Sequence, residues 1–198
     1  MTVTILLVRH AAHSQLGRVL SGRVGEVPLS EAGCAQAQRL ARRLGGERID
    51  ALHTSPVRRA GETAQALGAA LGLAPQVAEA LDEIDFGAWS GRSFADLEGD
   101  PDWQAWNAQR GTALPPGGES MAMVEARVLA HIRAVARRMA GAVVAMVSHA
   151  DVIRAGVAGI LGLSLDRVLA FDVDPASVTR IVAGDWGERL VSLNERCA

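Results

Sequence analysis

Residues 2–13 read TVTILLVRHAAH and constrain the fold more than any other stretch of the chain. Within them, Val3–Val8 is an unbroken apolar run rich in β-branched residues, which is typical of a strand buried on both faces of a sheet. In open α/β sheets, ligands bind at the carboxyl ends of such strands. This strand ends in Arg9-His10, so the sequence predicts an α/β fold with a candidate site there. Taken alone, the pair is equally compatible with two solvated side chains at a strand end.

The overall composition restricts the class of protein. The chain has 198 residues, 49% of them apolar, and we expect a single domain over residues 1–198. A formal net charge of −2 gives no basic field for nucleic acid. No apolar run approaches the about 20 residues that cross a membrane, and none has the form of a secretory signal. Cys34 and Cys197 have no metal or redox spacing, which predicts reduced thiols in a cytoplasmic protein.

Two later strands also end at functional side chains. Ile49–Thr54 is a short apolar strand that leads into a helix start at Ser55-Pro56, where serine is a candidate N-cap. Val143–Val147 is another doubly buried strand, and it ends at Ser148-His149 directly before a helix. Because parallel strands present their carboxyl ends at one edge of a sheet, we expect these residues to lie near His10.

The second helix begins with two adjacent arginines, Arg58 and Arg59. A helix N-terminus already favours anions, and arginines add charge-assisted hydrogen bonds to phosphate. Adjacent residues lie about 100° apart around a helix, so only one of the two can face a site. In the loop over residues 11–29, we expect Arg18 to be solvated and leave Arg23 open as an anion ligand.

Residues 86–117 predict a small flap over the strand ends, because five of the seven aromatic residues fall between Phe86 and Trp106. We expect loosely packed helical segments there, after a weak strand at Val77–Leu81. A carboxyl group beside aromatic surface has a raised pKa, which is how a general acid is made near neutral pH. The flap's cations, Arg92 and Arg110, argue against a second anion site because four acidic residues surround them: Asp96, Glu98, Asp100 and Asp102.

The remaining helices and strands follow from apolar periodicity. The spacing predicts a long helix from Ser120 to about Met139, and His131 lies off its apolar stripe, so we expect it to be solvated. Further elements are predicted at residues 30–44 and 152–161 as helices, and at 178–182 and 190–193 as a β-hairpin.

Two histidines, at least two arginines and a carboxyl group fit phosphoryl transfer through a histidine. A neutral imidazole is a competent nucleophile, and arginines neutralise the charge of a phosphate monoester. A carboxylic acid can protonate the leaving oxygen. We expect no metal, because His10 and His13 lie in a loop without further ligands at zinc spacing.

On these residues the chain resembles the histidine phosphatase superfamily, which has the phosphoglycerate-mutase-like fold. The resemblance covers essentially the whole length, and its motifs are specific in combination. They are Leu7-Val8-Arg9-His10, Pro28-Leu29-Ser30 with Gly33 and Gln36-Ala37, Ser55-Pro56-Val57-Arg58-Arg59-Ala60, Leu81 and Glu83 with Phe86-Gly87-Ala88-Trp89-Ser90-Gly91, Gly118-Glu119-Ser120, and Val147-Ser148-His149 with Ile153-Arg154.

The resemblance implies a three-layer α/β/α sandwich with a mainly parallel sheet, and it implies roles for particular residues. His10 would be the nucleophile and Glu83 the proton donor. The residues that would hold the phosphate are Arg9, Arg59 and His149, with Arg23 and Ala150 as further candidates. It implies no cofactor, a small phosphorylated metabolite as the only partner besides a second copy, and neither nucleic acid nor membrane. A monomer or a homodimer is expected.

The loop after His10 departs from the family pattern. Ala11, Ala12 and His13 stand where the family usually has glycine, an acidic or amide residue, and threonine, and Leu16 stands near a usual asparagine. These changes concern the loop's phosphate contacts and the choice of substrate. The expected function is a metal-independent phosphatase for small phosphate monoesters. The alternatives are a cofactor-dependent phosphoglycerate mutase and a catalytically weak phosphate-binding regulatory module.

Overall fold

The apolar strand at the start of the chain lies in the middle of a mixed sheet. In this computed structural model, which describes residues 1–24 and 26–196, β1 (Thr2–Arg9) pairs in parallel with β4 (Val143–Ser148) and antiparallel with β5 (Val178–Gly184). The order of the six strands in the described chain is β3-β2-β4-β1-β5-β6. The first four in that order are mutually parallel, with β2 at Ala51–Thr54 and β3 at Gln76–Val77. The predicted hairpin is present, because β6 (Gly187–Glu195) returns antiparallel to β5.

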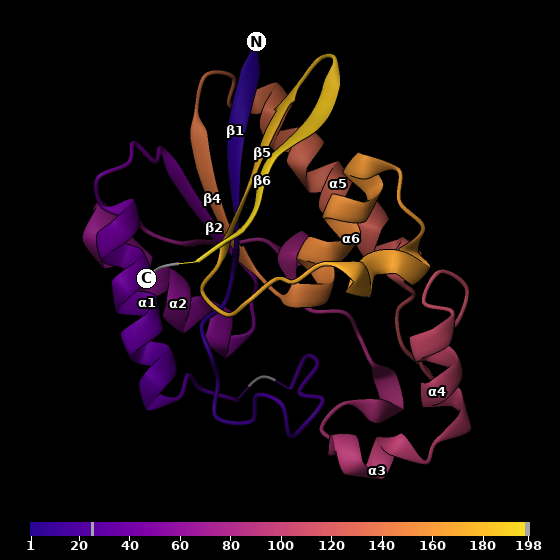
Figure 1. Ribbon diagram of the computed structural model, residues 1–198. Helices are drawn as coiled ribbons and strands as arrows, with labels where there is room; N and C mark the ends of the chain where they lie inside the picture. Colours follow the sequence, from indigo (N-terminus) through magenta and orange to yellow (C-terminus); the bar gives the residue numbers. More distant parts are fainter. Residues whose placement is uncertain (25, 197–198) are drawn as a thin grey trace.

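Helices cover both faces of this sheet, so the predicted three layers are confirmed (Figure 1). Leu6 and Val8 of β1 pack with the buried sides of α1 (Glu31–Leu44) and α2 (Arg58–Leu71). The alternate residues Ile5 and Leu7 belong to the core formed with α5 (Met121–Arg138) and α6 (Ala150–Leu161). Both sets are completely buried, as the unbroken apolar run predicted. A 3₁₀ segment, η3 (Leu165–Ala170), follows α6 and packs against it.

The segment expected as a strand over residues 77–81 is only partly one. After Gln76–Val77 the chain turns into a 3₁₀ helix, η1 (Glu79–Leu81), which buries Leu81 in the core and leaves Val77 at the exposed edge of the sheet. The Asp82 N–H closes this turn on the Glu79 carbonyl at 3.0 Å. The early end of the strand brings the acidic residues that follow back over the sheet's carboxyl edge.

The flap is helical but not loosely packed. It contains η2 (Gly87–Trp89), α3 (Phe94–Glu98) and α4 (Pro101–Ala108), beyond the carboxyl ends of the parallel strands in Figure 1. Trp89 lies edge-on to Trp103 and Trp106, with ring centroids 5.4 and 6.3 Å apart, and Trp89 and Trp106 are almost fully buried. Aromatic residues bury the largest areas per side chain, so this cluster holds the flap in one position.

His131 is not solvated as its place off the apolar stripe suggested. It is half-buried, and its Nε2 lies 3.1 Å from Nδ1 of His53 on β2. Burial is the main cause that lowers the pKa of both imidazoles, so the pair is held by one neutral hydrogen bond. Sequence periodicity does not indicate this contact, because it joins a strand and a helix whose residues are 78 positions apart.

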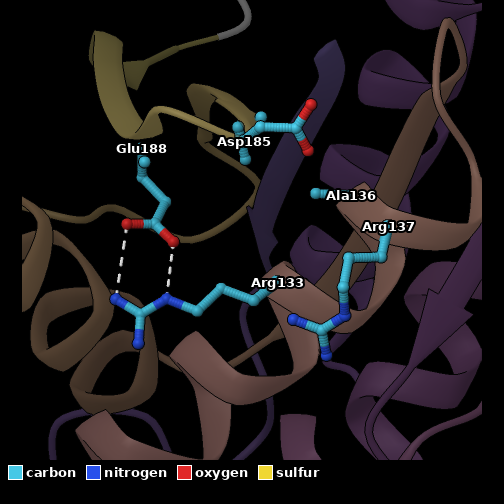
Figure 2. A pocket seen from close by; sticks show the side chains of 8 residues that line it. Arg133, Ala136, Arg137, Asp185 and Glu188 are labelled. Carbon is cyan, nitrogen blue, oxygen red and sulfur yellow. Dashed lines mark hydrogen bonds and ion pairs between the residues drawn. The ribbon is translucent and has the colours of Figure 1, made fainter. Parts of the chain in front are cut away.

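At the opposite end of the sheet a shallow hollow of about 410 Å³ lies between α5 and the turn of the β5–β6 hairpin. Figure 2 shows its ion pair, in which Arg133 Nε is 2.7 Å from Glu188 Oε1. This pair fixes the hairpin against α5. Along the described residues, no helix is long and apolar enough to cross a membrane.

The first helix approaches the loop after β1 so closely that only glycine fits between them. Ser30 caps α1 by accepting a hydrogen bond from the Gly33 N–H at 3.0 Å, and the Ser30 N–H donates to the Ala12 carbonyl. A Cβ on Gly33 would lie 1.8 Å from that carbonyl oxygen. The path of the loop that follows His10 is therefore fixed by main-chain contacts with α1.

We expect Gly33→Ala to lower the free energy of unfolding by about 1–3 kcal/mol, because the added methyl must displace backbone. Gly61→Ala is the matched control within α2, where a Cβ meets nothing within 4 Å. It should raise stability by about 0.5–1 kcal/mol, since alanine is the better helix former. Chemical denaturation of both variants measures the two shifts, and equal stability would contradict the close contact.

Candidate active site

The expected convergence at the carboxyl edge of the sheet is present. A cavity of about 340 Å³ is lined by Arg9 and His10 from the end of β1, Arg59 from α2, and Glu83 from the segment after η1. Ala150, the first residue of α6, lines it as well. Residues from four separate parts of the chain thus meet in one place, as the pattern of strand ends predicted.

His10 is buried and held as a neutral imidazole. Its Nδ1 lies 2.8 Å from the Ala11 carbonyl oxygen, which can only accept, so Nδ1 carries the proton. Its Nε2 accepts a hydrogen bond from Arg59 Nε at 3.2 Å. Burial, and then the charges of Arg59 and Arg9, lower the pKa of His10 well below its ordinary value. The lone pair of Nε2 is therefore available for bonding at all pH values near neutrality.

Arg59 connects the functional groups, whereas Arg58 does not reach them. The Arg59 guanidinium contacts His10, the Gly22 carbonyl at 2.8 Å, and Nδ1 of His149 at 3.2 Å. Arg58, its neighbour, is half-exposed and pairs with Glu62 at 2.8 Å on the outer side of α2. The predicted division between the two arginines is thus present in the structure, and it follows from their angular separation on the helix.

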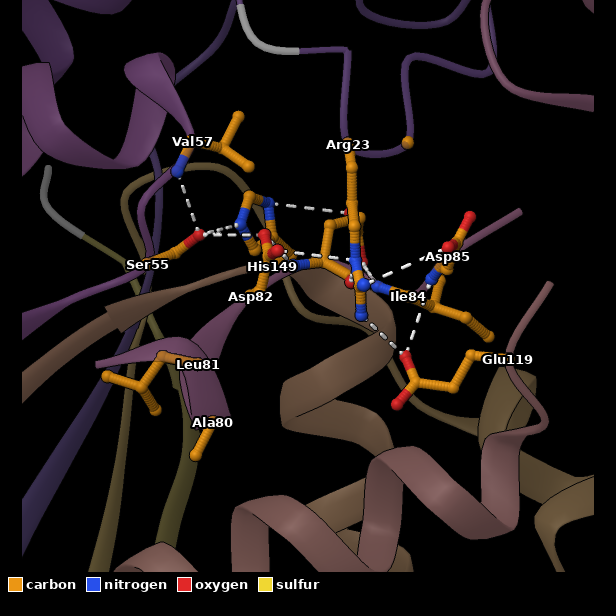
Figure 3. Close-up of polar contacts among 12 residues, drawn as sticks. Arg23, Ser55, Val57, Ala80, Leu81, Asp82, Ile84, Asp85, Glu119 and His149 are labelled. Carbon is orange, nitrogen blue, oxygen red and sulfur yellow. Dashed lines mark hydrogen bonds and ion pairs between the residues drawn. The ribbon is translucent and has the colours of Figure 1, made fainter. Parts of the chain in front are cut away.

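His149 lies behind His10 and is completely buried. Its ring is edge-on to that of His10, with centroids 5.0 Å apart. Its Nε2 is 2.8 Å from Ser55 Oγ, which in turn lies 3.3 Å from Asp82 Oδ1 (Figure 3). Val57 rather than Ser55 is the N-cap residue of α2, so the predicted helix start is two residues early; the Ser55 hydroxyl accepts from the Val57 N–H at 3.2 Å and also contacts His149.

Glu83 is the carboxyl group closest to the two central groups. Its Oε2 is 3.4 Å from His149 Nδ1 and 3.6 Å from Arg59 Nη2. Burial, and after it the negative charge of Asp151, raise the pKa of Glu83 to about 7 against the opposing charge of Arg59. A carboxyl group that titrates near 7 can exist both as an acid and as a base at working pH.

Arg9 and Arg23 differ in their position relative to the cavity, because Arg9 lines it and Arg23 does not. Arg9 donates from Nη1 to the Val173 carbonyl at 2.7 Å, while its Nε is buried without a hydrogen-bond partner in the described chain. Arg23 does not reach the cavity, contrary to its expected role as a phosphate ligand. Its guanidinium bonds the Glu83 carbonyl and Glu119, and pairs with Asp82 at 3.2 Å, as Figure 3 shows.

Three charged residues that were not predicted as site residues also line the cavity. Arg110, Asp151 and Arg154 line it, and Arg110 Nη1 lies 3.2 Å from Asp151 Oδ1. Arg110 is 7% exposed and lies over the Trp106 ring, 5.5 Å from its centroid. The acidic balance of the flap was therefore a misleading signal, because a buried cation faces the cavity. Arg154 could have been predicted as a site residue from the sequence, because it lies only five residues after His149.

No three histidine, cysteine, aspartate or glutamate side chains cluster as metal ligands would within the described residues. The side chains gathered at the cavity include a neutral imidazole (His10), the buried guanidinium group of Arg59, the partly buried one of Arg9, and a carboxyl group (Glu83) that titrates near 7.

Comparison with known proteins agrees with this arrangement. Residues 5–196 match the histidine phosphatase superfamily (branch 1). The chain is 32% identical to phosphoserine phosphatase 1 of Hydrogenobacter thermophilus over 98% of this chain and 93% of that protein. Its structure superposes on the mycobacterial glucosyl-3-phosphoglycerate phosphatase with a TM-score of 0.87 and 27% identity, covering 98% and 100% of the two chains. The TM-score with YhfR of Bacillus stearothermophilus is 0.91 at 26% identity, covering 98% and 97%.

The chain therefore belongs to the histidine phosphatase superfamily. The fold is that of the phosphoglycerate-mutase-like structures, and the named relatives support an enzyme that hydrolyses phosphoric monoesters.

We expect Arg59→Ala to lower kcat/KM for a phosphate monoester by about 10²–10³, the usual cost of losing one donor to a developing anion. Arg58→Ala is the matched control, since its side chain points away and should leave the rate within about threefold. Steady-state kinetics of the two variants measure this difference. Equal losses would contradict the assignment of Arg59 to the site.

Proposed function

We propose that the protein is a metal-independent phosphatase that hydrolyses small phosphate monoesters through a phosphohistidine on His10. The observation that carries the proposal is the state of His10. Its Nδ1 proton is held by the Ala11 carbonyl, so its Nε2 is an unprotonated nucleophile beside a guanidinium group. Arginines beside that nucleophile supply charge-assisted, geometrically specific hydrogen bonds to phosphate oxygens.

In the first step, His10 Nε2 attacks phosphorus, and the bond between phosphorus and the ester oxygen breaks. The phosphoryl oxygens take over the N–H of Arg59 that Nε2 accepts in the free protein, which releases the lone pair for attack. Glu83 in its acid form gives its proton to the leaving oxygen. In the second step, the Glu83 carboxylate takes a proton from water, whose oxygen attacks phosphorus and frees His10.

Arg9, Arg59, His149 and the start of α6 hold the phosphoryl group in this proposal. Arg59 Nη1 and Arg9 Nε are buried without hydrogen-bond partners in the described chain, and phosphate oxygens would satisfy both. Ala150 supplies the amino end of α6, where the helix dipole favours an anion. His149 can donate from Nδ1 when that atom carries the proton. The Ser55 hydroxyl permits this tautomer, because it can donate to Nε2 as well as accept from it.

The substrate class follows from the outer part of the cavity. Arg110, Asp151 and Arg154 place charges of both signs there, which suits monoesters whose second end is polar or ionic. Phosphoserine is a first substrate to test, because a relative 32% identical to this chain is named a phosphoserine phosphatase.

A phosphoglycerate mutase is the second candidate, and Arg110 is the observation that favours it. A mutase must hold a second anionic end of its substrate, and this buried arginine is a cation that lines the cavity. Both activities share the phosphohistidine and differ in what attacks it next. A phosphatase admits water to the intermediate, whereas a mutase excludes it.

The nucleophile is tested with p-nitrophenyl phosphate in the presence of a chelator. We expect the wild-type protein to turn over under these conditions and to trap acid-labile phosphate after rapid quenching. His10→Ala should lose both the turnover and the label. A His10→Ala variant with near wild-type turnover would contradict the mechanism. A wild-type protein that binds phosphate without turnover would support the regulatory module instead.

The proton donor is tested through its titration. Because burial raises the pKa of Glu83 to about 7, the acid form prevails below pH 7 and is lost above it. For alkyl monoesters, whose leaving groups need the proton, kcat/KM should therefore fall as pH rises through about 7.

Glu83→Gln should remove this pH dependence and lower the rate by about 10²–10⁴. The loss should be smaller for p-nitrophenyl phosphate, whose leaving group needs no proton. The exposed Glu79 of η1, which does not line the cavity, offers the matched control, Glu79→Gln. A uniform loss across leaving groups would assign Glu83 a positioning role and make Asp82 or Asp85 the next candidates for the acid.

Phosphatase and mutase are separated by supplying 3-phosphoglycerate with catalytic 2,3-bisphosphoglycerate. We expect free phosphate to accumulate faster than 2-phosphoglycerate. Rapid interconversion of the two phosphoglycerates with little release of phosphate would overturn the phosphatase proposal.

A further inference from the structure

A third imidazole lies beside the proposed nucleophile. His13 lines the same cavity as His10 and Arg59, and its ring centroid is 5.5 Å from that of His10. The side chain is 8% exposed, and its Nδ1 is buried without a hydrogen-bond partner among the described residues. A buried ring nitrogen without a partner is destabilising unless a ligand satisfies it.

The position of His13 is fixed by the main chain on both sides. His13 and Leu29 form an isolated antiparallel bridge, and the Ser14 N–H donates to the Pro28 carbonyl at 3.2 Å. The Leu16 N–H donates to the carbonyl of His13 itself at 3.2 Å. The imidazole is therefore held at the cavity by a structured loop.

Two neighbours of His13 also have a buried side-chain nitrogen that lacks a hydrogen-bond partner in the described chain. These nitrogens are Arg9 Nε and Arg59 Nη1. All three side chains line one cavity around His10. A tetrahedral oxyanion offers several acceptor oxygens in different directions, so one phosphoryl group could satisfy donors from all three residues.

The protonation state of His13 is also compatible with donating a hydrogen bond to phosphate. Burial, followed by the charges of Arg59 and Arg9, lowers the pKa of His13 to about 4. The imidazole is therefore neutral near pH 7 and carries one N–H that can donate. It adds a hydrogen bond without a further positive charge beside the buried Arg59 and the partly buried Arg9.

We propose that His13 is a phosphoryl-binding residue of this site, donating a ring N–H to a non-bridging oxygen of the phosphoryl group at His10. The inference rests on the proposed function and assigns a role to a residue of the altered loop. Leu16, which also lines the cavity, has no side-chain donor, and Ser21 donates its hydroxyl proton to Gln15 Oε1 at 3.0 Å. His13 is therefore the side chain of this loop at the cavity with a donor left for the oxyanion.

Binding of orthovanadate and of inorganic phosphate tests the proposal without requiring turnover. Calorimetric titration compares the wild-type protein with His13→Phe, which keeps a ring but has no donor, and His13→Asn, which keeps a donor. We expect His13→Phe to bind orthovanadate about tenfold more weakly, as expected for one lost hydrogen bond to a charged group, and His13→Asn to stay within about threefold. His131→Phe is the matched control at a half-buried histidine outside the site and should bind as the wild type does.

Kinetics with p-nitrophenyl phosphate should follow the same order. We expect His13→Phe to lower kcat/KM by about 10²–10³, and His13→Asn to recover most of that loss. If His13→Phe binds orthovanadate and turns over as the wild type does, this inference fails while the proposed function stands. If the wild-type protein neither binds these anions nor turns over, the proposed function fails, and this inference with it.

A further measurement is made on the wild-type protein, so its result does not depend on whether the His13→Phe variant folds. In protein labelled with ¹⁵N at histidine, the ring resonances of His13 are identified by their absence from His13→Asn. We expect orthovanadate to shift the protonated ring nitrogen of His13 and to leave that of His131 unchanged. Unshifted His13 resonances at saturating orthovanadate would overturn the proposal.

Discussion

The guanidinium group of Arg59 is the interaction on which the site depends. It is almost completely buried, and it contacts His10 at the end of β1, Gly22 in the following loop, and His149 at the end of β4. Burial of a cation is costly unless it is paired and hydrogen-bonded, and here Glu83 at 3.6 Å supplies the opposite charge. Both histidines are kept neutral first by their own burial and then by the charge of Arg59, since a second positive charge beside the guanidinium would be unfavourable. Arg59 thus reinforces the neutral state that burial imposes on the two imidazoles.

A second layer holds these groups in place. Ser55 binds His149 and Asp82, and Asp82 pairs with Arg23, which also bonds Glu119. Arg127 contacts the same Glu119 and the Glu83 carbonyl. Arg23 thus acts on the site through the backbone of Glu83 rather than through the cavity, and such support is what keeps catalytic side chains in a productive geometry.

Much of this could be predicted from the sequence because local patterns determine it. The unbroken apolar run of Val3–Val8 predicted the central strand, and helical geometry predicted that only one of Arg58 and Arg59 would face inward. The failures concern contacts between distant segments. Arg110 was judged by the acidic residues near it in sequence, whereas its partner is Asp151, 41 positions away. His131 likewise pairs with a residue on another element. Such contacts depend on the tertiary arrangement, which one-dimensional patterns do not contain.

The contact between Gly33 and the Ala12 carbonyl has a consequence for how the enzyme can change over evolution. The loop after His10 is guided by main-chain contacts with α1, namely the close approach of Gly33 and the bond from the Ser30 N–H to the same carbonyl. Neither contact involves the side chains of Ala11, Ala12 or His13. Of the three, His13 lines the cavity, so substitution at this position can alter the wall of the cavity without shifting the nucleophile. During evolution, the residues that contact the oxyanion can therefore change while the catalytic imidazole keeps its position.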